Sequence, residues 1–211
     1  MGVVVQRGNA AALDVLARDV DTGFAALVRA HSGAVYSTAL RLSGSRSTAE
    51  DIAQDAFVRA YRALRRFDAD RIRALEARPW LLTITLNVWR NHVRAATRRP
   101  RPDGRSTTPD PPDRGPGPAD VAEADDTARS LARLLAELPE RHRVPVVLRH
   151  VVGLSYAEIA TVQSCPVGTA KANVARGMAS LRQQAGAPSP PAKPPVPRPR
   201  RPAPVSHQEA R

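Results

Sequence analysis

Apolar residues recur at helical spacing in the first part of the chain. The first set is spaced mostly three, four and seven apart and comprises Phe24, Leu27, Val28, Val35, Ala39 and Leu42. This periodicity predicts an amphipathic helix that buries one face. Ser32-Gly33 is a weak point inside it, and Ser43-Gly44-Ser45 predicts its end.

Two further helices follow. Ser47 and Glu50 have the S-x-x-E spacing of a capping box, which predicts the start of a second helix. Its apolar face consists of Ile52, Ala53, Ala56, Phe57, Ala60, Tyr61 and Leu64. The charged interval 68–78 looks like a loop. A third helix is predicted from Pro79 to about Arg98, with four residues able to pack inward: Trp80, Leu81, Ile84 and Val88.

The stretch from Leu154 to Met178 predicts two short helices joined by a tight turn. Ser155 and Glu158 form a capping box, and Pro166 biases Cys165 away from the helical region, which ends the first helix. The second helix begins near Val167 or Gly168. Its packing side comprises Ala170, Val174, Met178 and Leu181, and its other side carries Thr169, Ala172, Asn173 and Arg176. This pattern is typical of a helix-turn-helix that reads DNA, and an ordinary αα-hairpin with a solvated face is the alternative.

The pattern as a whole predicts an all-α protein of two helical domains joined by a flexible linker. We expect an N-terminal extension over 1–20, a first domain over 21–101, a linker over 102–126, a second domain over 127–185 and a tail over 186–211. The linker is acidic and rich in proline, with too little apolar surface to offset chain entropy. The tail is basic and rich in proline, which predicts extended, disordered chain; it is either merely solvated or an arm that touches nucleic acid.

The distribution of charged residues along the chain supports the same division into two domains, a linker and a tail. The chain has a formal net charge of +12. Residues 24–101 hold 15 arginines against 6 acids (+9), and residues 102–126 hold 2 arginines against 7 acids (−5). Residues 131–185 and the tail are each +4. Such a surplus favours a polyanionic partner, with nucleic acid first and an anionic membrane surface second.

The third predicted helix carries a basic stripe. One side of it presents Thr83, Asn87, Arg90, Asn91, Arg94 and Arg98, and no acid occurs over 77–102. Guanidinium groups can bind phosphates, and the amides between them can form hydrogen bonds with bases. The alternative is that this face is merely solvated.

Acids gather near the start of the second predicted helix. This patch contains Glu50, Asp51, Gln54 and Asp55. Negative charge near a helix N-terminus is favourable by itself, so the spacing does not distinguish this from docking of a basic protein partner.

The sequence contains no signal for membrane insertion, secretion, metal binding or catalysis. No apolar run is long enough to span a membrane, and no secretory signal is present. The single cysteine, Cys165, fits a cytoplasmic protein and is better explained as a packed turn residue than as a redox sensor. No metal-ligand spacing, phosphate loop or nucleophile motif occurs. We therefore expect no catalytic residue, metal, cofactor or small-molecule substrate.

Three segments together resemble the extracytoplasmic-function (ECF) group of bacterial sigma-70 factors. They are AEDIAQDAFVRAYRALRRFD at 49–68, RPWLLTITLNVWRNHVRAATRR at 78–99 and LPERHRVPVVLRHVVGLSYAEIATVQSCPVGTAKANVARG at 138–177. Their order and their separation by an acidic linker make the resemblance specific.

The resemblance implies a role for each surface. The first domain looks like sigma domain two, whose acidic patch, here Glu50, Asp51, Gln54 and Asp55, docks on the β′ clamp helices of the RNA polymerase core. The basic stripe looks like the element that reads and opens the −10 promoter region. The second domain looks like sigma domain four, which reads the −35 region. There we expect DNA contacts from Thr169, Lys171, Ala172, Asn173 and Arg176.

Two other functional classes stay open at this point. One is a stand-alone helix-turn-helix regulator that binds duplex DNA as a dimer. The other is an interaction module for a regulatory partner, which in this family would be an anti-sigma factor. Under the principal hypothesis the protein is cytoplasmic, is no enzyme, and binds polymerase core and promoter DNA, with an anti-sigma factor as a further partner.

Overall fold

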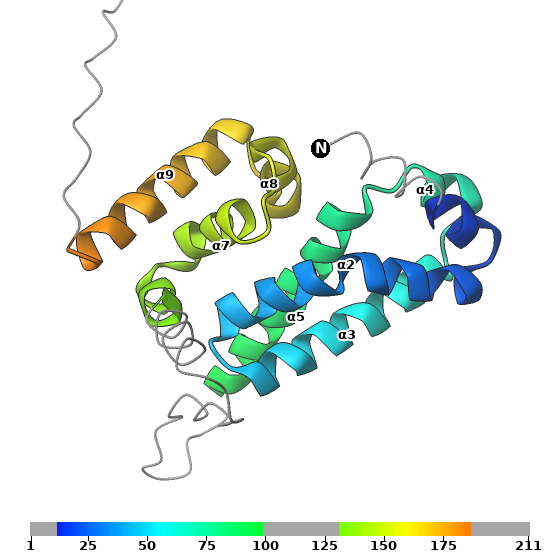
Figure 1. Ribbon diagram of the computed structural model, residues 1–211, viewed down its shortest axis with the longest axis horizontal. Helices are drawn as coiled ribbons and strands as arrows, with labels where there is room; N and C mark the ends of the chain where they lie inside the picture. Colours follow the sequence, from blue (N-terminus) through cyan, green and yellow to red (C-terminus); the bar gives the residue numbers. More distant parts are fainter. Residues whose placement is uncertain (1–11, 99–130, 187–211) are drawn as a thin grey trace, which may run out of the picture.

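The computed structural model of the protein describes residues 12–98 and 131–186. Every regular element in these two ranges is helical (Figure 1). The predicted linker and most of the tail lie outside the described residues. None of the helices in these ranges is long and apolar enough to cross a bilayer.

The first module comprises a short helical segment at 12–18 and four helices: α2 (Val20–Ser43), α3 (Arg46–Leu64), α4 (Ala69–Arg73) and α5 (Ala77–Arg98). α2 and α3 lie side by side and α5 packs against both (Figure 1). Several alanines on the contact faces are completely buried, namely Ala39, Ala49, Ala56 and Ala60. Small residues let helix backbones approach closely, and larger side chains such as Ile52 and Leu86 fill the remaining core.

Part of the predicted N-terminal extension belongs to this core. Leu13 and Leu16 in the 12–18 segment are 5% and 1% exposed. This segment lies so close to α2 that a Cβ on Gly23 would come within 2.5 Å of the Leu16 Cα. Only glycine allows this approach without a shift of the backbone.

Local signals set most helix ends. Gly44 adopts the left-handed conformation (φ 73°) and its N–H bonds to the Leu40 carbonyl, which closes α2 as predicted. The weak point predicted at Ser32-Gly33 does not interrupt α2. In the second module, Ser155 and Glu158 form the predicted capping box of α8 (Tyr156–Gln163).

Three local predictions for the first module were wrong. The cap of α3 is Ser45, whose hydroxyl accepts from the Thr48 N–H at 3.3 Å, so the predicted Ser47–Glu50 capping box does not form. The interval 68–78 is not all loop, because Asp68 caps the short helix α4. α5 begins at Ala77, two residues before the predicted start at Pro79.

The second module comprises a helical stretch at 131–137, α7 (Glu140–His150), α8, and α9 (Val167–Gln184). α9 packs against both α7 and α8, with Ala170 and Val174 buried as predicted and Met178 and Leu181 packed at the edge of the core. Between α8 and α9, Ser164 takes the left-handed conformation (φ 50°) and Pro166 is the N-cap of α9. This is the geometry of a helix-turn-helix.

Candidate functional site

The acidic patch lies on the exposed side of α3. Glu50, Asp51 and Gln54 are exposed, and neither Glu50 nor Asp51 has an ion-pair partner among the described residues. Asp55 instead pairs with Arg59, whose Nε–H lies 3.1 Å from both carboxylate oxygens of Asp55. This hydrogen bonding to Asp55 raises the pKa of Arg59. Because α3 begins at Arg46, the acids occupy its second and third turns, beyond the first turn where the helix dipole favours them most.

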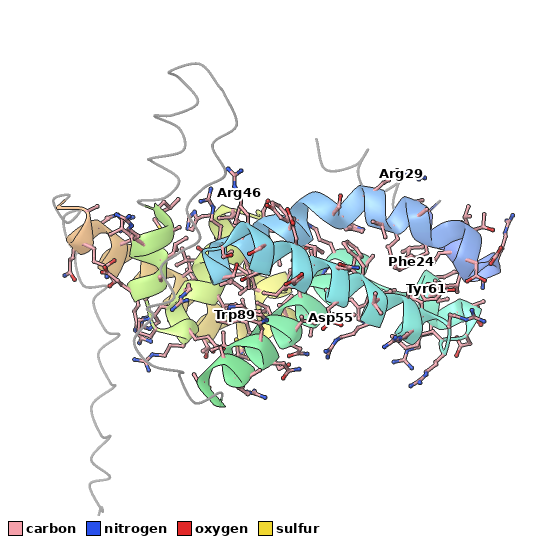
Figure 2. All side chains as sticks on the ribbon, turned by 90° about the horizontal axis from the view of Figure 1, so that it is seen from below. Phe24, Arg29, Arg46, Asp55, Tyr61 and Trp89 are labelled. Carbon is pink, nitrogen blue, oxygen red and sulfur yellow. The ribbon has the colours of Figure 1, made fainter. Side chains whose placement is uncertain are left out.

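Next to the acidic patch lies an apolar hollow that the sequence analysis did not predict. Its volume is about 400 Å³ and it is lined by Phe24, Gln54, Phe57, Val58 and Tyr61. We call it the aromatic hollow. The sequence pattern placed Phe57 and Tyr61 in the core, but both remain partly exposed. Figure 2 shows Tyr61 of α3 beside Phe24 of α2. The sequence offered one signal for this hollow, namely Val58, which is an apolar residue on the polar side of α3.

The polar face of α5 is only partly free. Asn87, Asn91 and Arg94 are exposed and share one side of the helix. The Thr83 hydroxyl donates to the Pro79 carbonyl at 2.9 Å, within its own helix. Arg90 is ion-paired, as described below, and the Arg98 side chain lies outside the described residues.

The face of α9 opposite its buried side presents the predicted reading residues. Thr169, Lys171 and Arg176 are exposed, whereas Ala172 and Asn173 are half-buried. The packing of α9 depends on a residue that sequence reasoning missed. A Cβ on Gly177 would lie 2.5 Å from Val146 Cγ2 and 3.0 Å from the His142 carbonyl oxygen, so glycine permits the close contact of α9 with α7.

The two modules contact each other through these surfaces. Arg90 on α5 binds Glu140 at the start of α7 with an Nε–Oε1 distance of 2.7 Å. Nearby, the Arg143 guanidinium lies 6.0 Å from the ring centroid of Trp89, and burial lowers the pKa of Arg143. Farther along the interface, Arg78 donates to the Val152 carbonyl.

A cavity of about 340 Å³ opens at this interface. It is lined by Arg90, Glu140, Arg141, Gln163, Cys165 and Asn173. The arrangement therefore brings one predicted DNA contact from each module, Arg90 and Asn173, to the same cavity. Cys165 is partly buried here against the core, in accordance with the packed-turn hypothesis. The described residues hold no group of three or more histidine, cysteine or acidic side chains that could bind a metal ion.

Comparison with known proteins gives one consistent picture. The family Sigma-70 region 2 matches residues 27–99, and the family Sigma-70, region 4 matches residues 128–181. The RNA polymerase sigma-H factor of Pseudomonas aeruginosa is 32% identical over 84% of this chain and 88% of its own length. The ECF RNA polymerase sigma factor SigW of Bacillus subtilis is 29% identical over 76% of this chain and 88% of its own.

A solved structure shares the fold. CnrH, in complex with the cytosolic domain of CnrY, superposes with a TM-score of 0.63 and is 28% identical. The match covers 86% of this chain and 99% of CnrH. Both modules therefore have counterparts in one chain of known structure.

Proposed function

The chain belongs to the ECF group of the sigma-70 family of RNA polymerase sigma factors, and we propose how its described surfaces divide the work of promoter recognition and transcription initiation. The observation that carries the proposal is the placement of three exposed polar surfaces on two modules: the acidic patch on α3, the amide and arginine face on α5, and the polar face of α9.

The acidic patch docks the polymerase core. Glu50, Asp51, Gln54 and Asp55 would contact the β′ clamp helices, as the family resemblance implies. The absence of ion-pair partners for Glu50 and Asp51 among the described residues supports this, because their charge is available to a basic surface. Their position beyond the first turn of α3 removes the helix dipole as a sufficient explanation.

The two modules then address separate promoter elements. On α5, Asn87 and Asn91 would specify the −10 region, with Arg90, Arg94 and Arg98 on phosphates. On α9, Thr169 and Asn173 would contact −35 bases, with Ala172 beside them and with Lys171 and Arg176 on phosphates. Amides suit base edges and cations suit phosphates, which motivates this division.

Promoter binding requires the modules to separate. Arg90 is engaged by Glu140, and Asn173 faces the cavity between the modules, so neither is fully available in the described arrangement. The linker that the composition predicts over 102–126 would let the modules move apart on polymerase. Bivalent binding by two docked modules can raise avidity by roughly 10²–10⁴.

The partners follow from this role. They would be polymerase core and promoter DNA, and with these partners the chain would act in the bacterial cytoplasm as a specificity subunit and not as an enzyme. An anti-sigma factor is a further partner, supported by the solved complex of the similar protein CnrH with a domain of another protein.

Run-off transcription with purified core and a pool of genomic fragments tests the function. We expect transcripts from a small set of fragments only when the chain is added, and sequencing their start sites gives the −35 and −10 elements. A gel-shift titration at physiological salt, with and without core, accompanies it. Tight and sequence-specific binding by the chain alone would favour a stand-alone regulator, and partner binding without transcription would favour an interaction module.

A further inference from the structure

The first turn of α7 places an arginine beside an arginine of α9. The two helices lie side by side (Figure 1) and are in close contact where Gly177 faces His142. A Cβ on Gly177 would lie 3.0 Å from the His142 carbonyl oxygen and 3.4 Å from the His142 Cβ. Arg176 directly precedes Gly177 on α9, and Arg141 directly precedes His142 on α7. The two arginines therefore flank the contact between the helices.

The charges of both arginines reach the same imidazole. Burial lowers the pKa of His142, and the positive charges of Arg141 and Arg176 lower it further. A charge has this effect on a group that lies close to it. The effect agrees with the placement of one guanidinium group on each side of the contact between α7 and α9.

Neither of these arginines is neutralised within the described chain. Arg141 and Arg176 are exposed, and no described acid forms an ion pair with either of them. Arg143, on the same helix as Arg141, instead donates to the carbonyls of Ala136 and Leu138. The positive charge at the crossing of α7 and α9 is therefore available to an anion.

The neighbouring acid, Glu140, is directed elsewhere. Its carboxylate binds Arg90 of α5. Successive residues of a helix lie about 100° apart around its axis, so the side chains of Glu140 and Arg141 leave α7 in different directions.

Arg141 also lies near the polar face of α9 that is proposed to read DNA. Arg141 and Asn173 line the same cavity of about 340 Å³. Arg176 follows Asn173 by three positions, and residues at this spacing are neighbours on a helix surface. A DNA strand that passes over Asn173 and Arg176 would therefore come within reach of Arg141.

We propose that Arg141 and Arg176 together form a binding site for the phosphodiester backbone of DNA at the crossing of α7 and α9. The two guanidinium groups bind neighbouring phosphates of one strand and fix the orientation of α9 in the groove. Guanidinium suits this task because it is always charged and presents several N–H donors in a planar fork. The inference rests on the part of the proposed function that places the polar face of α9 on DNA.

The site becomes accessible to DNA only when the modules separate. In the described arrangement it opens into the cavity that Arg90 of α5 also lines. A cavity of this volume holds a small molecule and not a duplex. The same turn of α7 thus contributes Glu140 to the contact between the modules and Arg141 to the contact with DNA.

The salt dependence of DNA binding tests the site. The full-length protein in complex with polymerase core is titrated with a promoter fragment selected by run-off transcription, at several salt concentrations. Arg141→Ala should weaken binding by the same factor for every −35 sequence. It should also reduce the slope of log K against log salt by about 0.9, for one lost phosphate contact. The double variant Arg141→Ala, Arg176→Ala should reduce this slope by about 1.8.

Two control variants separate a phosphate contact from a structural role. Arg141→Lys keeps the charge and should keep the slope of the wild type. Arg133→Ala removes an exposed arginine of the same module that is not among the residues lining the cavity, and it should also leave the slope unchanged. A slope that Arg141→Ala leaves unchanged, or that Arg141→Lys or Arg133→Ala lowers as much, would overturn the site.

Failure of the proposed function would give a different result. If the wild-type chain forms no promoter complex with core, that function is wrong. Binding of the full-length chain alone to a duplex of random sequence then decides the site. Arg141→Ala should again lower the slope by about 0.9, and an unchanged slope would overturn the site.

Discussion

Arg90 of α5 and Glu140 of α7 form an ion pair with an Nε–Oε1 distance of 2.7 Å, although 50 positions separate them in the chain. The pair joins the helix proposed to read the −10 element to the module proposed to read the −35 element. A residue suited to phosphate thus has a carboxylate partner within its own chain. The described arrangement thus holds part of the proposed DNA-binding surface in a contact between the modules.

Breaking this pair should loosen the contact between the modules. We expect Glu140→Lys to increase the separation of fluorophores placed on α2 and α9, since like charges would then face each other across the interface. Pairs with this exposure are worth about 0.2–1 kcal/mol, so the shift in population should be about 1.4–5 fold. Glu137→Lys is the matched control, because it makes the same change at an exposed acid without a partner among the described residues. An equal response of both variants would show that net charge, not the pair, controls separation.

Charge reversal on the acidic patch should weaken binding to polymerase core. Replacing Asp51 and Asp55 with Lys should cost about 2–5 kcal/mol if the complex buries these carboxylates against basic partners. Binding is measured by titration of labelled chain with core, and circular dichroism should show unchanged helix content. Glu76→Lys, an exposed acid outside the patch, should bind as the wild type does. Unchanged affinity of the double variant would exclude this patch as the docking surface.

The two DNA-reading faces should respond to different promoter positions. In a promoter library transcribed by the complex with core, Asn87→Ala should relax preference at −10 only, because a good bidentate base contact is worth about 1–3 kcal/mol. Arg176→Ala should lower −35 binding for all sequences and reduce the salt slope by about 0.9 for one lost phosphate contact. A preference at −10 that survives Asn87→Ala would show that the reading face lies elsewhere on the helix.

Two glycine substitutions should change stability in opposite directions. Gly177→Ala should lower the free energy of unfolding by about 1–3 kcal/mol, because its Cβ would overlap Val146 and press on the His142 carbonyl. Gly33→Ala is the matched control in α2, where a Cβ meets nothing within 4 Å, and it should raise stability by about 0.5–1 kcal/mol. Both values come from urea unfolding followed by circular dichroism. Destabilisation by Gly33→Ala would mean that α2 has a contact there which the described residues do not supply.

Acidification should destabilise the protein in part through His31. This side chain is half-buried, its Nε2 has no partner among the described residues, and burial followed by the charge of Arg78 lowers its pKa below the usual 6.5. The unfolded state therefore binds more protons just below pH 6.5, so the stability contributed by neutral His31 is lost as the pH falls through that range. Unfolding free energies at pH 7.5 and 5.5 should differ less in His31→Leu than in wild type. His150→Leu, at an exposed position, should leave the difference unchanged.

The sequence by itself predicted the helical class, several helix ends and the helix-turn-helix. Gly44, the Ser155–Glu158 box and Pro166 act within one or two turns of the chain, so their effects can be predicted from neighbouring residues. The same local information failed at Ser47, because Ser45 is an equally good cap two residues earlier and α3 begins there. It also predicted that Thr169 and Arg176 lie on the solvated side of α9, since periodicity alone separates the buried side of a helix from its solvated side.

Only the tertiary structure decided which surfaces are shared between distant segments. The aromatic hollow needs Phe24 from α2 beside Phe57 and Tyr61 from α3, and the Arg90–Glu140 pair needs the modules in contact. Gly177 matters because α7 crosses α9 at that point. Periodicity shows that a face is apolar or charged, but not which other face it meets. That choice depends on how helices far apart in the chain fit together and bury their side chains, and the relevant distances appear only once the chain is folded.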